Sequence, residues 1–438
     1  MANNIFRRLT TTLNMITVFD DVSFVQAMLD FERALSAAEA ENGIIEDDVA
    51  EIIGSCCDVL KFDLARLSEE AVQHGTVVIP LVRQLAQLVA GKDKNVSGWV
   101  HFGTTSQDVI DTAMILQLKK AFRFMETDIL RLDAGLNSLA EKHEKTVTIG
   151  RTLMQPAVPI TFGQKVKGWR LAILRSWRRI ENAGAETFVL QLGGAAGNLS
   201  AFGDKAEAVA ESCAKRLELG LSDHVWHVHR DRLVAFCSSV AILVGSLGKM
   251  ATDVSLLMQP EIGEAFEPFE TDRGGSSAMP HKRNPVSCLT ALSASKRVPH
   301  LVATLFDVMP QEHERALGGW QAEWTTIPAI MEAAAGSLAS MAEVAEGLEV
   351  NPEAMRRNLT ALNGLVMSER VTLELSKRMG RGEAITIVSE ACRKAVDKDC
   401  DLSDILKADN RITKVFSANE INELMSSDSY LGTSNSSK

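Results

Sequence analysis

Proline is distributed very unevenly along this chain. Residues 1–79, 81–155 and 160–259 contain no proline, whereas six of the eleven prolines lie between 260 and 310. Proline lacks a backbone donor and clashes with the preceding helical turn, so stretches without it are open to long helices. These stretches are rich in Ala, Leu, Glu and Lys, which favour helix. We therefore predict an all-α protein whose irregular backbone is concentrated near the proline cluster.

Apolar residues recur with helical spacing in the proline-free stretches. Those at 24, 28, 31, 35 and 38 form a stripe that predicts a helix capped by Asp21 or Ser23. Residues 109–142 are predicted to form one long helix, which only Gly135 interrupts. The stripe from 231 to 258 is too broad for one neighbour to cover, so we expect it inside a bundle or at an oligomer interface. Its most apolar part, 233–247, is expected to be too short and too polar to span a bilayer.

The helical patterns divide the chain into three predicted domains. An N-terminal helical domain covers 1–105, a central helical-bundle domain covers 106–350, and a small domain of shorter helices covers 351–438. Residues 260–285 contain three glycines and four prolines, and we predict a long loop there, with a catalytic loop at 265–285. Long loops without secondary structure of their own tend to be functional. Helices are expected to resume after Pro285 and after Pro328.

The composition argues against several kinds of protein. A net charge of −11 disfavours general binding to nucleic acid or to an anionic membrane, because counterion release needs a basic face. A content of 5% aromatic residues, without strand-like alternation, disfavours a β-sandwich or barrel. The seven cysteines form no CxxC pair, and no apolar run follows Arg7 and Arg8. We therefore expect buried, reduced thiols in a cytoplasmic protein without a secretory signal.

The segment GGSSAMPHKRNP at 274–285 combines groups that a surface turn does not need. Two glycines let the backbone open and close, and prolines stiffen the far end. Two hydroxyls, an ammonium, a guanidinium and a carboxamide lie between them. This segment resembles the signature of the fumarase/aspartase superfamily, whose members form or break a C–O or C–N bond β to a carboxylate.

Two further segments resemble that superfamily in the expected order. HFGTTSQD at 101–108 looks like its first substrate-binding segment, and GRTLMQPA at 150–157 looks like its second. The resemblance implies a three-domain fumarase/aspartase-type fold with a long central helical bundle. It also implies a homotetramer whose sites are each built from three subunits, and it implies neither a cofactor nor a metal.

Other residues distinguish the branches of the superfamily. Adenylosuccinate lyases have histidines where this chain has Thr76 and Leu153. The chain instead resembles bacterial 3-carboxy-cis,cis-muconate cycloisomerases over nearly its whole length, most tellingly in QEHERALGGWQAEW at 311–324. Those cycloisomerases often have tryptophan in place of Leu153, which leaves the substrate open between carboxymuconate, sulfomuconate and an aspartate derivative.

The resemblance assigns roles to individual residues. Ser276 matches the general base, and Lys282 would stabilise both its alkoxide and a dianionic aci-carboxylate intermediate. Lys282, Arg283 and Arg315 give an acidic chain the local cations that a small polycarboxylate substrate needs. The predicted substrate-binding residues are His101, Thr105, Ser106, Thr152, Gln155, Asn284 and Arg315.

The favoured function is lactonisation of 3-carboxy-cis,cis-muconate, or a close analogue, to 4-carboxymuconolactone by general acid and base chemistry. The alternative is a lyase that breaks a C–N or C–O bond and releases fumarate or a related enoate. A catalytically inactive relative is the third reading, against which the intact 274–285 segment argues.

Some residues fit either a structural or a functional role. The histidines at 224, 227 and 229 could suggest a metal site, but nothing at ligand spacing completes it, so we expect a partly exposed helix entrance. His143 could lie in a pocket or simply end a helix. Trp320 and Trp324 are expected to be packing residues rather than platforms for a substrate.

Overall fold

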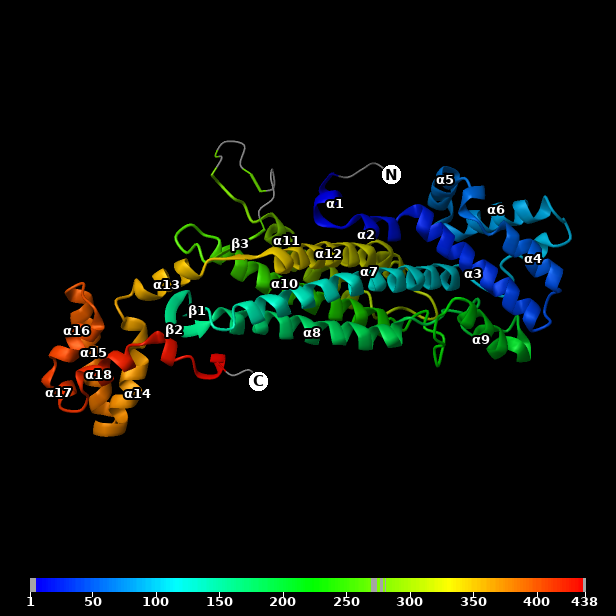
Figure 1. Cartoon of the computed structure of the whole chain (residues 1–438). Helices are drawn as coiled ribbons and strands as arrows, with labels where there is room; N and C mark the ends of the chain where they lie inside the picture. The colour runs from blue at the N-terminus through cyan, green and yellow to red at the C-terminus, as the bar shows by residue number, and fades with distance from the viewer. Residues whose placement is uncertain (1–4, 269–273, 276–278, 280, 436–438) are drawn as a thin grey trace. The chain divides into compact units, whose positions relative to one another are not determined.

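The computed structural model describes residues 5–268, 274–275, 279 and 281–435. Its regular structure is almost wholly helical, which confirms the predicted all-α class (Figure 1). The chain divides into two compact units, each built from segments far apart in sequence. The first unit comprises Met1–Leu130, Leu174–Gly248 and Thr290–Ser340, and the second comprises Arg131–Ile173, Lys249–Leu289 and Met341–Lys438. The division into domains at 1–105, 106–350 and 351–438 stays a prediction.

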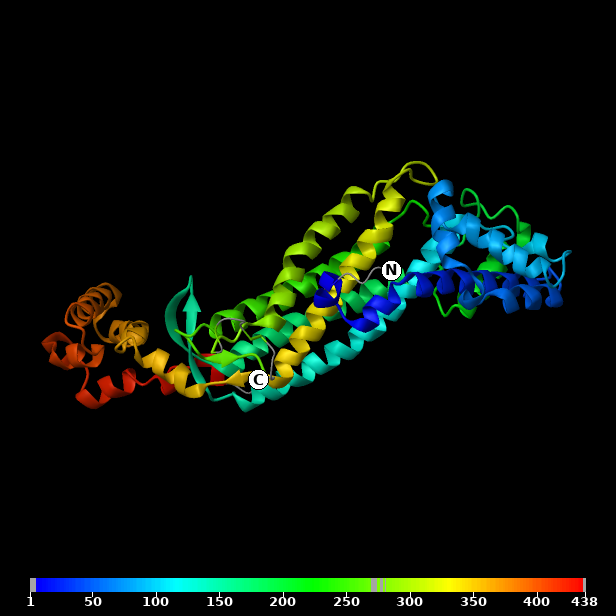
Figure 2. The same cartoon turned by 90° about the horizontal axis from the view of Figure 1, so that it is seen from above.

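The long helices contribute residues to both units and run alongside one another in both views (Figures 1 and 2). Phe122 of α7 stacks on Trp177 of α8 at 4.9 Å, and the hydroxyls of Ser176 and Ser246 join α8 to α10 at 3.2 Å. The predicted helices at 109–142 and 231–258 are therefore confirmed, the first beginning three residues early. The long helices are α7 (Ser106–Lys142), α8 (Phe162–Thr187), α10 (Asp231–Leu257), α11 (Val286–Asp307) and α12 (Gly319–Gly347).

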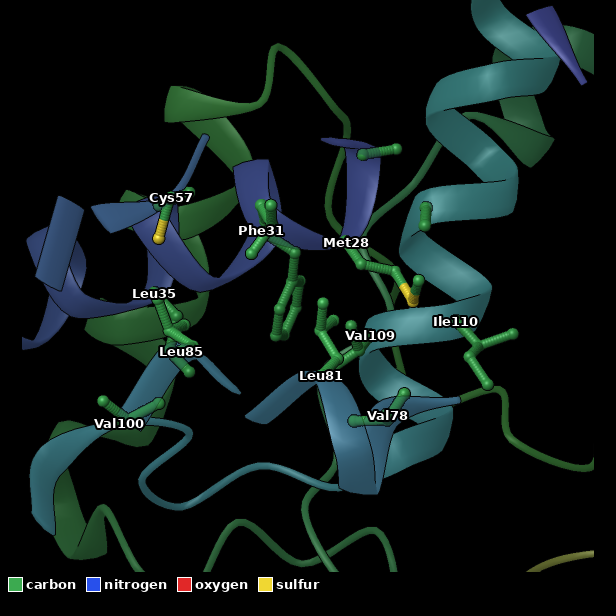
Figure 3. Close-up of a cluster of buried hydrophobic side chains, with 14 of the residues drawn as sticks. Met28, Phe31, Leu35, Cys57, Val78, Leu81, Leu85, Val100, Val109 and Ile110 are labelled. Atoms are coloured by element: carbon green, nitrogen blue, oxygen red, sulfur yellow. The ribbon is translucent and has the colours of Figure 1, made fainter. Parts of the chain in front are cut away.

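Shorter helices pack against one end of α7 in the first unit. Apolar side chains of α3, α6 and α7 meet there in a continuous core, in which Phe31, Leu81 and Val109 are fully buried (Figure 3). The shorter helices of the first unit are α1 (Ile5–Thr10), α2 (Leu13–Val18), α3 (Asp21–Glu41), α4 (Asp47–Cys56), α5 (Leu64–His74), α6 (Val78–Ala90) and α9 (Ala206–Arg216).

Helix α3 confirms the predicted apolar stripe but corrects its cap. The N-cap is Asp20, whose carboxylate accepts a hydrogen bond from the backbone N–H of Ser23 at 2.7 Å. Asp21 and Ser23 already lie inside the first turn, so the prediction of either as the cap was wrong. An N-cap side chain must accept from a donor two or three residues ahead, and here Ser23 supplies that donor.

The proline cluster marks helix boundaries less faithfully than predicted. Helix α11 begins directly after Pro285, as expected, but it continues through Pro299. Helix α12 begins at Gly319 and continues through Pro328, so the prediction of a helix only after Pro328 was wrong. The residues beside these prolines explain the tolerance: Val298 and Ile327 are fully buried. Burial of each such side chain stabilises by about 1.5–3 kcal/mol, which offsets a helical proline that costs about 3 kcal/mol.

The second unit contains short strands that the sequence did not reveal. Strands β1 (Val147–Thr152) and β2 (Gln155–Thr161) form an antiparallel hairpin, and β3 (Ala265–Phe266) pairs with β4 (Glu349–Val350). The predicted shorter helices after residue 350 are confirmed. They are α13 (Pro352–Thr360), α14 (Ser368–Met379), α15 (Arg381–Asp397), α16 (Leu402–Ala408), α17 (Asn410–Thr413) and α18 (Ala418–Leu424).

Helix α10 is longer than the apolar stretch at 233–247 from which it was judged. By length and composition alone it could cross a membrane, and it is the one such helix among the described residues. The expectation of a stretch too short and too polar considered only residues 233–247, and it therefore underestimated the apolar length of this helix. More than half of its most apolar window is buried within the chain, as in the core helix of a bundle.

The cysteines agree with the expectation of reduced thiols. All seven are free, and five of them are buried, while Cys392 and Cys400 are partly exposed. Burial raises the pKa of the Cys213 and Cys237 thiols well above the ordinary range. A thiol that stays protonated is a poor nucleophile, so these residues act as small apolar side chains.

We predict that Gly135→Ala destabilises the protein by about 1–3 kcal/mol, the usual range for overpacking. A Cβ at Gly135 would lie 2.9 Å from the backbone carbon of Ala345, where α7 and α12 meet in the second unit. Gly168→Ala on α8 is the matched control, because nothing lies within 4 Å of its added Cβ. That control should gain about 0.5–1 kcal/mol from helix propensity. Urea denaturation measures both, and equal effects would contradict the close approach.

Candidate active site

The buried carboxylate of Asp108 organises the segment at 101–108. Its Oδ2 accepts hydrogen bonds from the hydroxyl of Thr104 at 3.0 Å and from the backbone N–H of Thr105 at 3.1 Å. Oδ1 accepts from the backbone N–H of Gly193 and Oδ2 also accepts from that of Gly194, each at 2.9 Å. One side chain therefore connects the start of α7, where Ser106 is the first residue, to a turn far away in sequence.

His227 is the remaining partner of Asp108. Its Nε2 lies 2.7 Å from Asp108 Oδ1, and both side chains are almost completely buried. The expectation of a partly exposed helix entrance was therefore wrong for His227, although His224 and His229 are exposed. The hydrogen bond to Asp108 compensates the cost of burying the ring, which sequence spacing alone could not show.

A second buried network lies one turn further along α7. Arg230 is fully buried between Asp111 and Glu323, with Nη1 at 2.7 Å from Asp111 and Nε at 3.0 Å from Glu323. Burial opposes the charge of Arg230, but the two carboxylates outweigh it and raise its pKa. The indole N–H of Trp320 donates to Asp111 at 2.9 Å, and Trp324 packs edge-on against Trp320. Both tryptophans therefore pack as expected.

Arg315 is brought next to the start of α7. Its Nε donates to the side-chain oxygen of Gln107 at 3.2 Å, and its Nη2 donates to the carbonyl of Ala195 at 3.1 Å. Arg315 remains exposed, so part of its guanidinium faces outward. Arg315 thus lies beside Gln107, the residue that follows Thr105 and Ser106, within one unit.

His101 belongs to the same group and pairs with a residue that the sequence did not single out. Its Nδ1 lies 2.6 Å from Oε1 of Glu32, which is buried on α3. Burial lowers the pKa of the imidazole, but the charge and hydrogen bond of Glu32 and the charge of Asp108 raise it by more, so the net shift is upward.

An apolar cavity of the first unit lies away from this site. It has a volume of about 530 Å³ and is lined mainly by apolar side chains, including Leu67, Ile110 and Trp324. None of the predicted site residues within the described part of the chain lines it. An apolar cavity offers little to a polycarboxylate, so the polar segment at 101–108 is the better candidate.

Thr152 and Gln155 lie opposite each other at the tip of the β1–β2 hairpin, and both are exposed. Leu153 and Met154 form the turn between them, with φ of 48° and 66°, and Leu153 is 97% exposed. Non-glycine residues in this left-handed region are strained, so the tip needs support from the residues around it.

Arg151 supplies that support. Its Nη1 donates to Oε2 of the fully buried Glu264 at 3.1 Å, and Glu264 also accepts from Thr148 at 3.1 Å and from Asn358 at 2.8 Å. One buried carboxylate thus joins the hairpin, the start of the 265–285 segment and α13. The sequence showed Arg151 within its motif, but it gave no sign of Glu264 as its partner.

A backbone hydrogen bond joins the two ends of the 274–285 segment. Asn284 donates its backbone N–H to the carbonyl of Gly274 at 2.9 Å, and Gly274 has φ of 68°. A Cβ there would lie 2.5 Å from the Asn284 carbonyl oxygen, so this turn requires glycine. Lys282 is exposed. Ser276, the predicted general base, lies outside the described residues.

From the sequence we expect Arg283 to be a cation that faces the substrate. In the structure its guanidinium contacts other residues of the protein. It donates to Glu349 at 3.2 Å and to the carbonyl of Glu267 at 2.9 Å, and it lies over the ring of Phe266. The carboxylate of Glu267 accepts from the N–H of Cys288 at 2.7 Å, at the start of α11. Arg283 therefore fixes the end of the loop beside Lys282 and Asn284.

His143 directly follows the last residue of α7, and its side chain is buried. Its ring is buried edge-on against Phe162, and its Nδ1 lies 3.1 Å from the hydroxyl of Thr146. Burial and the nearby Lys142 lower its pKa. Over the described part of the chain, no three His, Cys, Asp or Glu side chains are grouped to bind a metal ion.

The predicted residues thus fall into two groups. His101, Thr105, Ser106 and Arg315 come together in the first unit, whereas Thr152, Gln155, Lys282 and Asn284 belong to the second. Sequence reasoning missed Glu32, Glu264 and Glu267, the carboxylates that support these groups. Glu32 lies far from the recognisable motifs in the sequence. Glu264 and Glu267 lie near one of them, but their spacing does not indicate which residues they pair with.

Comparisons with known proteins identify the class. The model of a lyase family, described as "Lyase", matches residues 7–299, and a model described as "Adenylosuccinate lyase C-terminus" matches residues 364–436. The chain therefore belongs to this lyase family, and its fold is of the fumarase/aspartase type, as the sequence predicted.

Within that class the chain is similar to cycloisomerases. It is 43% identical to the 3-carboxy-cis,cis-muconate cycloisomerase of Pseudomonas aeruginosa over 98% of this chain and 94% of that protein. A similar identity, 43%, holds for the enzyme of the same name from Bradyrhizobium diazoefficiens, over 95% of this chain and 92% of that protein. The crystal structure of the 3-carboxy-cis,cis-muconate lactonizing enzyme from Pseudomonas putida matches with a TM-score of 0.93 at 40% identity, covering 99% of this chain and 97% of that one.

We predict that Arg283→Met speeds amide hydrogen exchange at residues 281–285 roughly tenfold, because the loop end loses its ion pair, carbonyl contact and ring contact. Arg356→Met is the matched control, since it removes only an exposed ion pair with Asp428 at 3.5 Å. Exchange followed by mass spectrometry compares the two. Unchanged exchange in Arg283→Met would mean that the turn at Gly274 fixes the loop alone.

Proposed function

We propose that this protein is a cycloisomerase that lactonises 3-carboxy-cis,cis-muconate, or a close muconate analogue, to 4-carboxymuconolactone. The observation that carries the proposal is 43% identity over 98% of the chain to an enzyme of that name. The first group of site residues supports it, because His101, Thr105, Ser106 and Arg315 present donors and cations to an anion.

The chemistry explains the need for those cations. One substrate carboxylate attacks a double bond, and a proton adds to the adjacent carbon, which lies α to another carboxylate. The intermediate is an aci-carboxylate with two negative charges, and fixed donors must stabilise it. Lys282 and Asn284 suit that task, and Ser276 suits transfer of the proton to or from carbon.

The start of α7 suits a second substrate carboxylate. The N-terminus of a helix attracts anions through its free N–H groups and its dipole. The hydroxyl of Ser106 and the outward part of Arg315 can complete that site, and a guanidinium binds a carboxylate bidentately. Thr152 and Gln155 would bind the substrate from the hairpin tip, where both are exposed.

The proposal includes a homotetramer with each site shared between three subunits. Its support is the set of large apolar residues that the long helices expose: Leu130 at 65%, Ile242 at 48%, Leu289 at 61% and Phe306 at 54%. Helix surfaces of this kind are usually covered in an oligomer. We further propose that the protein acts in the cytoplasm on a small polycarboxylate, without cofactor or metal, and binds neither nucleic acid nor membrane.

Light scattering tests the assembly. We expect a tetramer at micromolar concentration, because apolar surface on several faces of the long helices favours association into a bundle. A monomer at that concentration would contradict both the tetramer and the shared site.

Turnover tests the reaction. The purified protein is mixed with 3-carboxymuconate, and we expect loss of the diene absorbance together with uptake of one proton per product, because a carboxylate becomes a neutral lactone. The alternative lyase would instead consume fumarate in the presence of an amine. Fumarate consumption without diene loss would favour that alternative, and neither reaction would indicate an inactive relative.

Ser276→Ala tests the proton-transfer residue within that reaction. We expect loss of turnover by at least about a hundredfold with little change in substrate binding, since general acid and base catalysis contributes about 10²–10⁴-fold. Circular dichroism and light scattering check folding and assembly. A folded Ser276→Ala enzyme that keeps its activity would remove Ser276 from this role.

A further inference from the structure

Glu32 and His101 form a close pair beside the candidate carboxylate site. Oε1 of Glu32 lies 2.6 Å from Nδ1 of His101, and the Glu32 side chain is 1% exposed whereas that of His101 is 18% exposed. The pair therefore joins the interior of the first unit to its surface. His101 precedes Thr105 and Ser106 in the same segment, so its ring lies near the start of α7.

The backbone at His101 is held in an unusual conformation. Its φ of 62° lies in the left-handed region, which is strained for a non-glycine residue. Such strain persists only where the surroundings fix the residue. The contact with Glu32 is such a constraint, and it sets which way the imidazole faces.

The titratable groups of α3 and α7 near this ring are acidic, while Arg315, which contacts Gln107, adds a cation to the same group of residues. Glu32 and Glu39 face the region from α3, and Asp108 faces it from α7. Burial, and then the charge of Glu32, raise the pKa of Glu39 to about 9, so Glu39 is neutral at pH 7. Neither oxygen of Glu39 has a hydrogen-bond partner in the described part of the chain. A buried carboxylate requires a charged or donating partner, and His101 is that partner for Glu32.

The second ring nitrogen of His101 is left available. Nδ1 is used by Glu32, while Nε2 forms no hydrogen bond to any described residue. When the ring is protonated, Nε2–H is a charged donor at the partly exposed end of the pair. A carboxylate accepting from such a donor forms one of the stronger hydrogen bonds available in proteins.

We propose that Glu32 is a positioning residue that keeps His101 as an imidazolium, so that its Nε2–H binds one carboxylate of the substrate. The inference rests on the proposed function and deepens it, because it states that His101 must be protonated for this site to bind the substrate carboxylate. Binding of a polycarboxylate is then strongest when His101 is protonated and weakens as the pH rises through its titration. Loss of Glu32 leaves only the charge of Asp108 to oppose the effect of burial, so the same weakening begins at lower pH.

The experiment compares Glu32→Gln with Glu39→Gln. Both replace a buried glutamate of α3 with a residue of equal size, but Glu39 forms no hydrogen bond to His101. The probe is tricarballylate, a tricarboxylate with no double bond to react, and its Kd for the full-length protein is measured by calorimetry between about pH 6 and pH 9. Binding needs no turnover, so the result does not depend on the muconate reaction.

We expect Glu32→Gln to raise the Kd about tenfold at pH 7 and to move the loss of binding to lower pH, while Glu39→Gln resembles the wild type. His101→Gln should show the same tenfold loss without pH dependence, and it covers the case in which Glu32→Gln fails to fold. Equal Kd values in wild type and Glu32→Gln would overturn the inference, as would equal losses in both glutamate variants. A wild-type protein that binds with this dependence but does not turn over carboxymuconate would overturn the proposed function alone.

Discussion

The carboxylate of Asp108 is the interaction on which the first group of site residues depends. It is fully buried, yet it accepts from Thr104, Thr105, Gly193 and Gly194, and it also contacts His227. A buried charge is tolerated only when such donors surround it, and here they come from three separate segments. Because those segments must converge for the charge to be satisfied, folding itself sets the position of Thr105 at the start of α7.

The cations of this acidic chain divide into two kinds. Arg151 and Arg230 are paired with buried carboxylates, and Arg283 is paired with the exposed Glu349, so these three arginines fix structure. Arg315 and Lys282 are exposed and remain available to an anion. The sequence alone cannot distinguish a structural arginine from one that binds substrate, since an arginine in a motif looks the same whether its partner is a buried glutamate or a substrate. The separation needs the three-dimensional positions of the acids.

The sequence predicted those features that are encoded locally. Helices α7 and α10 have many turns of periodic apolar residues, so their existence followed from spacing alone. The β1–β2 hairpin did not, because its turn is formed by Leu153 and Met154 instead of the usual glycine or asparagine. Glu32 and His101 are 69 residues apart, and His227 and Asp108 are 119 apart. Pairings over such distances leave no pattern in a single sequence, which is why the supporting carboxylates were missed and His227 was misjudged.

Left-handed backbone recurs in each of the three segments that carry the candidate chemistry. His101 and Leu153 have φ of 62° and 48°, and Gly274 has φ of 68°. Each position is accompanied by a specific restraint: Glu32 contacts His101, Glu264 binds the arginine before the hairpin tip, and Asn284 closes the turn at Gly274. Strain at the three non-glycine positions, His101, Leu153 and Met154, lowers stability, and glycine or asparagine would be less strained there. The fold therefore carries an imidazole in one segment and an apolar tip in the other at a cost in stability, which indicates a role for these side chains beyond packing.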